Sequence, residues 1–169
     1  GMVVDSVYYH DSKITNYSLS DYELSINLPS VIPSETLDSI TVYYQGVPES
    51  NGMGSFQQTT HMGAPIVWTL SEPYGARDWW PCKQTLNDKI DSVDIYIHNP
   101  EGYRGASNGK FMYENTADGH TTAHWKHRHP ITTYLVAIAV TNYEVYSSNI
   151  TLNSGSQVAY VNYVFPEDL

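Results

Sequence analysis

The histidines are the first residues whose type and spacing could indicate a functional site, here a zinc site. The sequence places four of them in one short stretch: His120, His124, His127 and His129. A protein zinc site takes three or four ligands in a tetrahedral arrangement. On a strand, side chains alternate between faces, so His127 and His129 would share one face while His124 points to the other. Lys126 and Arg128 alternate with them, as on a solvated strand. We therefore interpret His124, His127 and His129 as structural side chains rather than metal ligands.

A second stretch, Trp68–Cys82, could bind a cationic group. It contains three of the chain's 4 tryptophans and its only cysteine. Within it, Glu72 lies between Ser71 and Pro73 and close to aromatic residues. A carboxylate held in this way could meet a substrate cation. The same pattern also fits a carboxylate that caps a turn or is simply solvated.

The motifs of several hydrolase and nucleotide-binding classes are missing from the chain. The sequence contains no H-E-x-x-H, no G-x-S-x-G and no P-loop. Cys82 follows Pro81 and has no neighbouring histidine that would mark a nucleophile. We interpret Cys82 as a small apolar residue that packs. The sequence therefore contains no complete active site.

Composition narrows the class of protein. The chain has 169 residues, which fits one domain, and Asp plus Glu number 18 against 8 Lys plus Arg, for a net charge of −10. Such a surface repels phosphate backbones, so nucleic acid is excluded as an expected partner. No apolar run approaches the roughly 18 residues needed for a membrane span. Charged residues make up only 15%, a profile that we associate with extracytoplasmic β-domains.

Alternation of apolar and polar residues predicts strands that could position these groups. In the clearest case, Tyr22, Leu24, Ile26 and Leu28 share one face of a strand at 22–28. Other strands are expected at 2–9, 39–44, 66–70, 93–97, 110–114, 122–127, 142–147 and 157–165. The expected turns include Asp118-Gly119 and Asn153–Gly155. Turn signals recur every 8 to 12 residues or so, which is typical of a β-sandwich.

Three segments carry more specific expectations. The continuously apolar run 133–140 predicts a strand buried on both faces. The segment 39–44 should bury Ile40, Val42 and Tyr44. The segment 83–89 could form one helical turn at most, and 45–60, which contains Gly52, should be a long loop or a loosely paired hairpin. The expected fold is all-β, a β-sandwich or saddle-like domain of mostly antiparallel strands with little or no helix.

Several ordered motifs resemble one family. Thr69-Leu-Ser-Glu-Pro-Tyr-Gly-Ala-Arg-Asp-Trp-Trp-Pro-Cys82 resembles the T-Q-x-E-P-x-x-A-R-x-x-F-P-C motif of the aminopeptidase N-like zinc metallopeptidases, which include leukotriene hydrolase. The segment from Pro130 to Val140 is similar to the family's P-M-x-T-Y-L-x-A-F-x-V, and Val42 to Gly46 to its I-x-Y-x-G. The resemblance extends from about residue 20 to 146.

This resemblance implies that residues 1–169 form a single, non-catalytic N-terminal domain. Its partner would be the protein's own C-terminal catalytic domain, which would follow residue 169 and hold the zinc. The family domain usually carries further strands before the position of residue 2, so we expect some N-terminal strands to be missing. The substrate would be a peptide N-terminus, and Glu72 matches the family glutamate that binds the free α-amine. Leu70 replaces a family glutamine, so this position lacks that residue's polar contact. The chain alone would be inactive, and the parent bacterial and extracytoplasmic.

Two other functions remain open at this point. A free-standing β-sandwich module could use Trp79, Trp80 and Trp125 to hold carbohydrate or protein, because aromatic faces stack on such ligands. Alternatively, the chain could be a scaffold domain of an inactive homologue.

Overall fold

Antiparallel strands form nearly all of the regular structure, in a computed structural model that describes residues 1–49 and 54–169. The predicted all-β class is confirmed. In the segment 45–60, which was expected to be a loop or a loosely paired hairpin, Gly52 lies outside the described residues. The strands are β1 (Met2–Tyr9), β2 (Ser12–Ile14), β3 (Tyr17–Ser20), β4 (Glu23–Ile26), β5 (Ile40–Gly46), β6 (Phe56–His61), β7 (Ala64–Thr69), β8 (Val93–Pro100), β9 (Arg104–Ser107), β10 (Lys110–Ala117), β11 (His120–His127), β12 (Ile138–Thr141), β13 (Glu144–Thr151) and β14 (Gln157–Val164). The 3-10 helices are η1 (Gly75–Asp78), η2 (Thr133–Leu135) and η3 (Pro166–Asp168).

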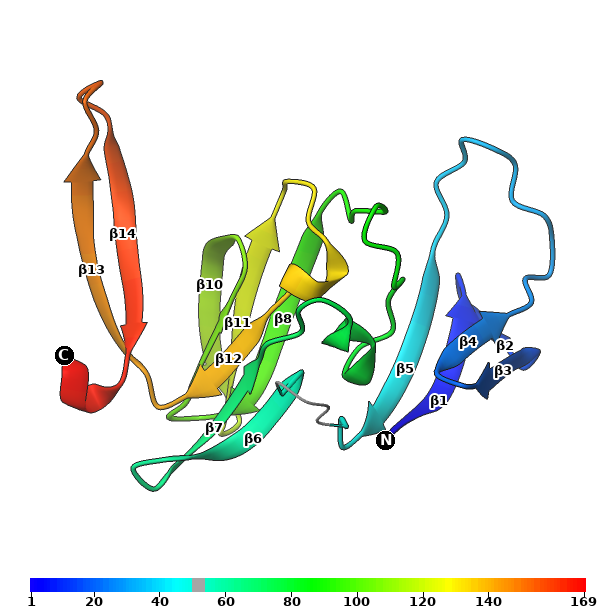
Figure 1. Ribbon diagram of the computed structural model, residues 1–169, viewed down its shortest axis with the longest axis horizontal. Helices are drawn as coiled ribbons and strands as arrows, with labels where there is room; N and C mark the ends of the chain where they lie inside the picture. The colour runs from blue at the N-terminus through cyan, green and yellow to red at the C-terminus, as the bar shows by residue number, and fades with distance from the viewer. Residues whose placement is uncertain (50–53) are drawn as a thin grey trace.

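The N-terminal part consists of a sheet in the order β2-β1-β5 and the separate β3-β4 hairpin (Figure 1). Alternation along β1 directs Val7 to the covered face, where it is fully buried. Its register partners Ile14 and Val42 lie beside it on β2 and β5. This part lies to one side of the central strands and is joined to them through the segment after β5 (Figure 1).

The central part contains the main core. A sheet in the order β10-β11-β8 packs against one in the order β6-β7-β12-β9. Ile97, Ala123 and Trp125 form the buried centre, and side chains of β9 and β12 pack on it. Gly105 on β9 allows the close approach, because a Cβ there would lie 2.7 Å from Ile97 Cγ2. Trp125 Nε1 donates to Gly105 O at 2.9 Å, which satisfies its polar atom inside the core.

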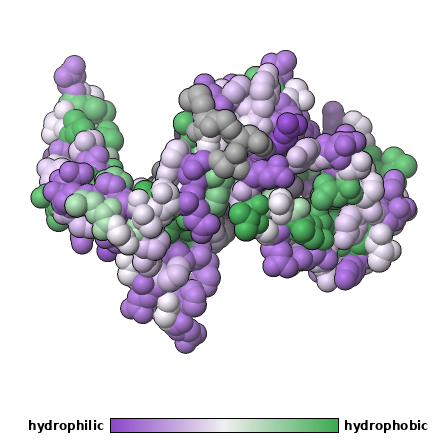
Figure 2. Space-filling model, turned by 60° about the horizontal axis from the view of Figure 1, so that its bottom comes forward, coloured by the Kyte–Doolittle hydropathy of each residue, from purple (hydrophilic) through white to green (hydrophobic). Residues whose placement is uncertain are grey.

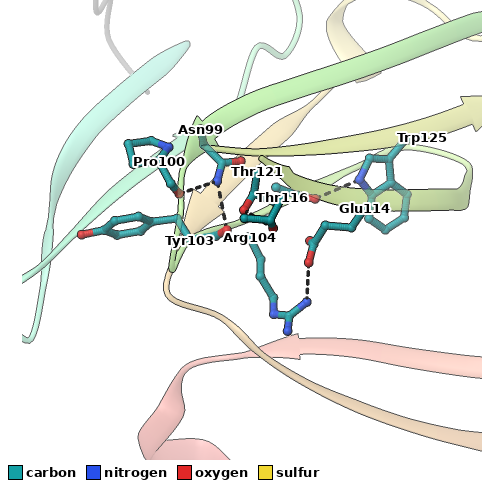
Figure 3. A network of polar contacts seen from close by, with 9 residues as sticks. Asn99, Pro100, Tyr103, Arg104, Glu114, Thr116, Thr121 and Trp125 are labelled. Atoms are coloured by element: carbon teal, nitrogen blue, oxygen red, sulfur yellow. Dashed lines mark hydrogen bonds and ion pairs between the residues drawn. The ribbon is translucent and has the colours of Figure 1, made fainter. Parts of the chain in front are cut away.

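A polar network closes one end of this core (Figure 3). Asn99 Nδ2 donates to Tyr103 O at 2.9 Å, so the turn between β8 and β9 is held from within. Arg104 Nη1 donates to Glu114 Oε1 at 2.9 Å and joins β9 to β10. These bonds partly satisfy side chains that would otherwise be buried without partners.

The C-terminal hairpin of β13 and β14 projects from the central part (Figure 1). Its base packs on the core, where Tyr163 lies 5.7 Å from Trp125 between ring centroids. After the hairpin, Phe165 stacks on His61 at 3.7 Å, and Glu167 Oε1 lies 2.5 Å from His61 Nε2. The chain end is therefore attached to the last residue of β6.

One strand prediction needs correction. The apolar run 133–140 is not one buried strand, because it forms η2 and then β12. Thr133 Oγ1 donates to Lys83 O at 3.2 Å, and Val136 N donates to Thr133 O, so the run turns between layers before pairing. Leu135 is consequently 51% exposed. The segment 83–89 contains one hydrogen-bonded turn, in which Asp88 N donates to Thr85 O at 3.3 Å, and no helix, in agreement with the expected limit of one turn; the nearest 3-10 helix lies earlier, at η1.

Burial was also overestimated at the N-terminal part. Ile40 and Tyr44 are 43% and 36% exposed, although β5 forms as expected. Tyr22 lies outside β4, with φ at 65° in the turn before it, and is 66% exposed. The alternation predicts the strands correctly, but no second layer within residues 1–49 and 54–169 covers these side chains.

No helix among residues 1–49 and 54–169 is long and apolar enough to cross a membrane.

Candidate functional site

The loop from Leu70 to Cys82, which leaves β7 and passes through η1, is held by buried polar contacts. Ser71 is 3% exposed, and its hydroxyl is the centre of the arrangement. Ser71 Oγ donates to Ser55 O at 3.3 Å and accepts from Trp79 Nε1 at 2.9 Å. Gly75 N donates to Ser71 O at 2.8 Å, which closes the turn around Glu72 and Pro73. The backbone on both sides of Glu72 is thus anchored.

Close packing adds to this anchoring. A Cβ on Gly75 would lie 2.1 Å from Ser55 Oγ, so only glycine allows the two segments to approach this closely. The Trp79 ring lies 6.3 Å from Phe56 and 6.0 Å from Trp80 between centroids. Sequence reasoning missed the roles of Ser55, Ser71 and Gly75 because Ser55 is distant along the chain; the Pro-Tyr-Gly punctuation was the only local signal.

Glu72 presents its carboxylate outward from this anchored backbone. Its side chain is exposed and has no hydrogen-bond or ion-pair partner within residues 1–49 and 54–169. The peptide bond between Glu72 and Pro73 is cis. Leu70 and Tyr74, which flank Glu72 in the loop, are 43% and 57% exposed. The arrangement can supply a charged acceptor with apolar side chains nearby, which suits a cation with hydrogen atoms to donate.

The far side of the loop contacts the N-terminal part. The Arg77 guanidinium lies 5.5 Å from the Tyr22 ring centroid, within the range of a cation–π contact. Tyr22 in turn donates from its hydroxyl to Glu49 Oε2 at 3.1 Å. These contacts connect the loop to the turn before β4.

Cys82, at the end of the loop, is half-buried. Burial raises the pKa of its thiol to about 11, because a thiolate is poorly solvated there. A thiol that remains protonated at neutral pH is a weak nucleophile. The packing role expected for Cys82 is consistent with this.

The structure separates the four clustered histidines. His127 and His129 lie together, with ring centroids 5.9 Å apart, whereas His124 lies on the opposite face of β11. His120 stacks instead on His98 of β8 at 4.8 Å, a contact that the sequence analysis missed because it joins two strands. No group of three or more His, Cys, Asp or Glu side chains in the described part of the chain could hold a metal ion.

His124 has a structural environment. It is 8% exposed and stacks on Tyr96 at 4.2 Å. Its Nε2 lies 2.8 Å from Asp94 Oδ1, and Arg128 Nη2 donates to Asp94 Oδ2 at 2.5 Å. The hydrogen bonds from Arg128 and then His124 lower the pKa of the Asp94 carboxyl below its usual value. The cluster ties β8 to the end of β11.

The tryptophans do not form one binding platform. Trp125 is 7% exposed and belongs to the core. Trp79 and Trp80 are half-buried, and Trp79 is engaged with Ser71. Two surface hollows, of about 640 and 330 Å³, lie elsewhere, since neither Glu72 nor Leu70 lines them. Among the residues selected from the sequence, Glu72 alone combines a fixed backbone with a free functional group.

Comparison with known families gives one match over most of the chain. Residues 4–135 match the sequence model of the peptidase M1 N-terminal domain. This range contains the whole loop from Leu70 to Cys82 and the buried core residues Ile97, Ala123 and Trp125. None of the curated proteins is similar enough in sequence to match the chain.

Solved structures share the fold at low identity. A two-domain M1 zinc metallopeptidase mutant bound to L-arginine matches with a TM-score of 0.82 and 20% identity over 96% of this chain and 38% of its own. Legionella pneumophila aminopeptidase A, in complex with aspartic acid, matches with a TM-score of 0.76 and 21% identity over 98% of this chain and 19% of its own. Native yeast LTA4 hydrolase matches with a TM-score of 0.64 and 18% identity over 86% of this chain and 23% of its own. The present chain therefore spans well under half the length of each of these proteins.

Proposed function

The chain belongs to the peptidase M1 N-terminal domain family, and we propose that it packs on the catalytic domain of a zinc aminopeptidase and binds the substrate's α-ammonium group through Glu72. The observation that carries the proposal is the Glu72 carboxylate, which has no partner among residues 1–49 and 54–169, on an anchored loop. The backbone that carries this carboxylate is already in place when the substrate arrives, so binding costs the ordering of one side chain and not that of the whole loop.

The electrostatics favour a free peptide N-terminus over an internal peptide bond. An ammonium group can donate a charge-assisted hydrogen bond to Glu72, worth about 1.5–3 kcal/mol. An internal amide nitrogen carries no charge and gains much less. When a second domain covers the loop, water is displaced, and the attraction between carboxylate and ammonium grows as the effective dielectric constant falls. This is the selectivity of an exopeptidase.

Leu70 would lie close to the bound substrate. It is 43% exposed, flanks Glu72 in the loop and has no polar atom in its side chain to share in holding the amine. We propose that it contributes apolar contact, so that Glu72 is the main recognition group offered by this domain.

Zinc binding falls to the other domain in this proposal. The described residues do not fit a zinc site, because they hold no suitable group of three ligands. The part played by this chain is therefore confined to substrate binding and orientation, and the 169 residues alone should have no peptidase activity.

The direct test is steady-state kinetics of the full-length protein on an aminoacyl p-nitroanilide. Glu72→Gln keeps the size of the side chain but removes its charge, and should lower kcat/KM by about 10- to 150-fold, the equivalent of 1.5–3 kcal/mol. Glu35→Gln is the matched control, because Glu35 is also an exposed loop carboxylate. An unchanged kcat/KM for Glu72→Gln would refute the assigned role.

A blocked substrate adds specificity to this test. N-acetylation removes the ammonium charge, so the wild-type protein should lose most of its rate on the acetylated compound. Glu72→Gln should cause little further loss there, because its partner is already absent. Equal effects of Glu72→Gln on free and acetylated substrates would indicate that Glu72 acts on the fold and not on the amine.

An extracytoplasmic location remains a separate proposal. It rests on the low content of charged residues, 15%. Fractionation of cells that produce the native protein, with detection in the cytoplasmic and extracytoplasmic fractions, tests it.

A further inference from the structure

The hairpin of β13 and β14 has an apolar face that is left exposed within residues 1–49 and 54–169. In this described part of the chain, both strands pair only with each other. The register places Ser148 opposite Tyr160 and Ile150 opposite Val158, and directly opposed residues share a face. We call the face made by Tyr146, Ile150, Val158 and Tyr160 the outer face of the hairpin. These four side chains are 52%, 50%, 47% and 44% exposed.

The opposite face of the hairpin reaches the core at its base. Tyr163 lies on that opposite face and packs against the central core. On the same face Val161 remains 50% exposed, and none of the four outer-face side chains belongs to the described core cluster. Hydrophobic side chains are visible on the projecting limb at the left of Figure 2.

The charge pattern is unusual for a projecting hairpin. Residues 145–165 contain no Asp, Glu, Lys or Arg, although the chain as a whole has a net charge of −10. Both strands of a two-stranded sheet are edges, and exposed edges are normally protected by charged side chains. Depletion of charge together with tyrosine enrichment is typical of the buried centre of an interface. An isolated two-stranded hairpin is also only marginally stable in water.

We infer that the outer face of the hairpin is a docking surface for the second domain of the same polypeptide. The identity of this partner rests on the proposed function. The two-domain metallopeptidase matches 96% of this chain, and the unmatched remainder is shorter than the hairpin, so most of the hairpin recurs there. That match occupies 38% of its chain, which leaves most of that polypeptide available to cover such a face. A domain interface within one chain buries about 600–1,500 Å², which a face of this kind can help to supply.

Thiol labelling of the full-length protein tests the inference. Ile150→Cys places a thiol on the outer face, and Ile40→Cys is a matched control on β5, where the native isoleucine is 43% exposed. The native Cys82 contributes little background, because its thiol pKa is raised to about 11. Labelling by a maleimide is followed at each position by peptide mass spectrometry. The thiol of Ile150→Cys should react at least about tenfold more slowly than that of Ile40→Cys, since reaction requires the domains to open.

The outcomes of the labelling experiment distinguish the two molecules that could cover the outer face: the second domain of the same polypeptide and a second copy of the protein. Slow labelling that is independent of protein concentration, in a protein of monomeric mass, supports docking within the polypeptide. Slow labelling that is lost on dilution, together with a dimeric mass, would assign the face to a second copy and overturn the inference. Labelling of Ile150→Cys as fast as that of a fully exposed thiol would also overturn it, whatever the rate at Ile40→Cys.

If the Ile150→Cys variant fails to fold, the inference can still be tested on the unmodified protein. Hydrogen exchange of the unmodified full-length protein should show slow amides in both β13 and β14. Fast exchange throughout the hairpin contradicts docking. The result is separate from that of Glu72→Gln: a fast-exchanging hairpin combined with a large kinetic effect would remove this inference and leave the proposed function in place.

Discussion

The loop around Glu72 and the β13–β14 hairpin both present side chains that have no partner among the described residues, but the two are supported in different ways. The loop has little regular structure, yet Ser71, Gly75 and Trp79 fix it through buried hydrogen bonds and close contacts. The hairpin has a complete ladder between its strands but is packed only at its base. The loop thus offers one polar group at a defined position, whereas the hairpin offers apolar area. The first arrangement suits recognition of a small charged group, and the second suits docking of a large surface.

The largest expected effect compares packing in the core with packing on the hairpin. Trp125→Ala should lower the free energy of unfolding of the 169-residue chain by about 3–5 kcal/mol, because it leaves a cavity among buried side chains. Tyr160→Ala, on the exposed outer face, should change it by less than about 0.5 kcal/mol in the same chain. Urea unfolding followed by tryptophan fluorescence for Tyr160→Ala, and by circular dichroism for both variants, measures the difference.

Similar losses for the two variants would contradict the comparison, because they would mean that this domain itself covers the hairpin. If Tyr160→Ala instead becomes costly only in the full-length protein, the difference reports the contribution of the second domain.

The next effect concerns the close contact that shapes the loop. Gly75→Ala places a Cβ 2.1 Å from Ser55 Oγ and 2.8 Å from Ser55 Cβ, so the loop or Ser55 must move. Such overpacking should cost about 1–3 kcal/mol of stability. In the full-length protein it should also lower kcat/KM, because Glu72 would be displaced from its position.

Ser55→Gly provides the rescue for this variant. It removes the hydroxyl and Cβ that the new methyl group meets, so the double variant should recover part of the loss of Gly75→Ala. Additive effects of the two substitutions would show that the contact does not determine the shape of the loop.

The parts predicted from sequence are those governed by local periodicity. The strand at Met2–Tyr9 and the hairpin around Asp118-Gly119 appear with the expected bounds or close to them. Both depend on side chains that alternate and on residues that tolerate positive φ, here 52° at Asp118 and 74° at Gly119. These signals lie within a few residues of the structure that they specify.

The parts that sequence could not give depend on distant contacts. Alternation in β5 does not reveal whether a second layer covers Ile40, and none does among the described residues. The run 133–140 turns because Thr133 bonds to Lys83, which is far away in sequence. Likewise, the support of the Glu72 loop by Ser55 follows from the folded chain. Glu72 itself was selected through the resemblance of its motif, and its role stays a prediction.

The smallest expected effect is a pH-dependent loosening of the contact between Glu167 and His61, which attaches the chain end after the hairpin to β6. The hydrogen bond with His61 is the main cause that lowers the pKa of the Glu167 carboxyl. Because this pKa is below its unfolded value of about 4.3, the attachment contributes fully above that pH and is lost as the pH falls through the folded value. Glu167 is partly exposed, so solvent screens the pair and the effect on Tm should be slight.

Hydrogen exchange between pH 6 and 3 can detect this local release. In the wild-type chain, exchange of the amides of Phe165 to Asp168, corrected for intrinsic rates, should accelerate below about pH 4 relative to Glu167→Gln, in which the attachment is already weakened. Amides of the Glu72 loop should not respond to Glu167→Gln, because its anchoring through Ser71 involves no titrating group. Equal responses of the two regions would contradict their independence and would indicate that the loop and the hairpin open as one cooperative unit.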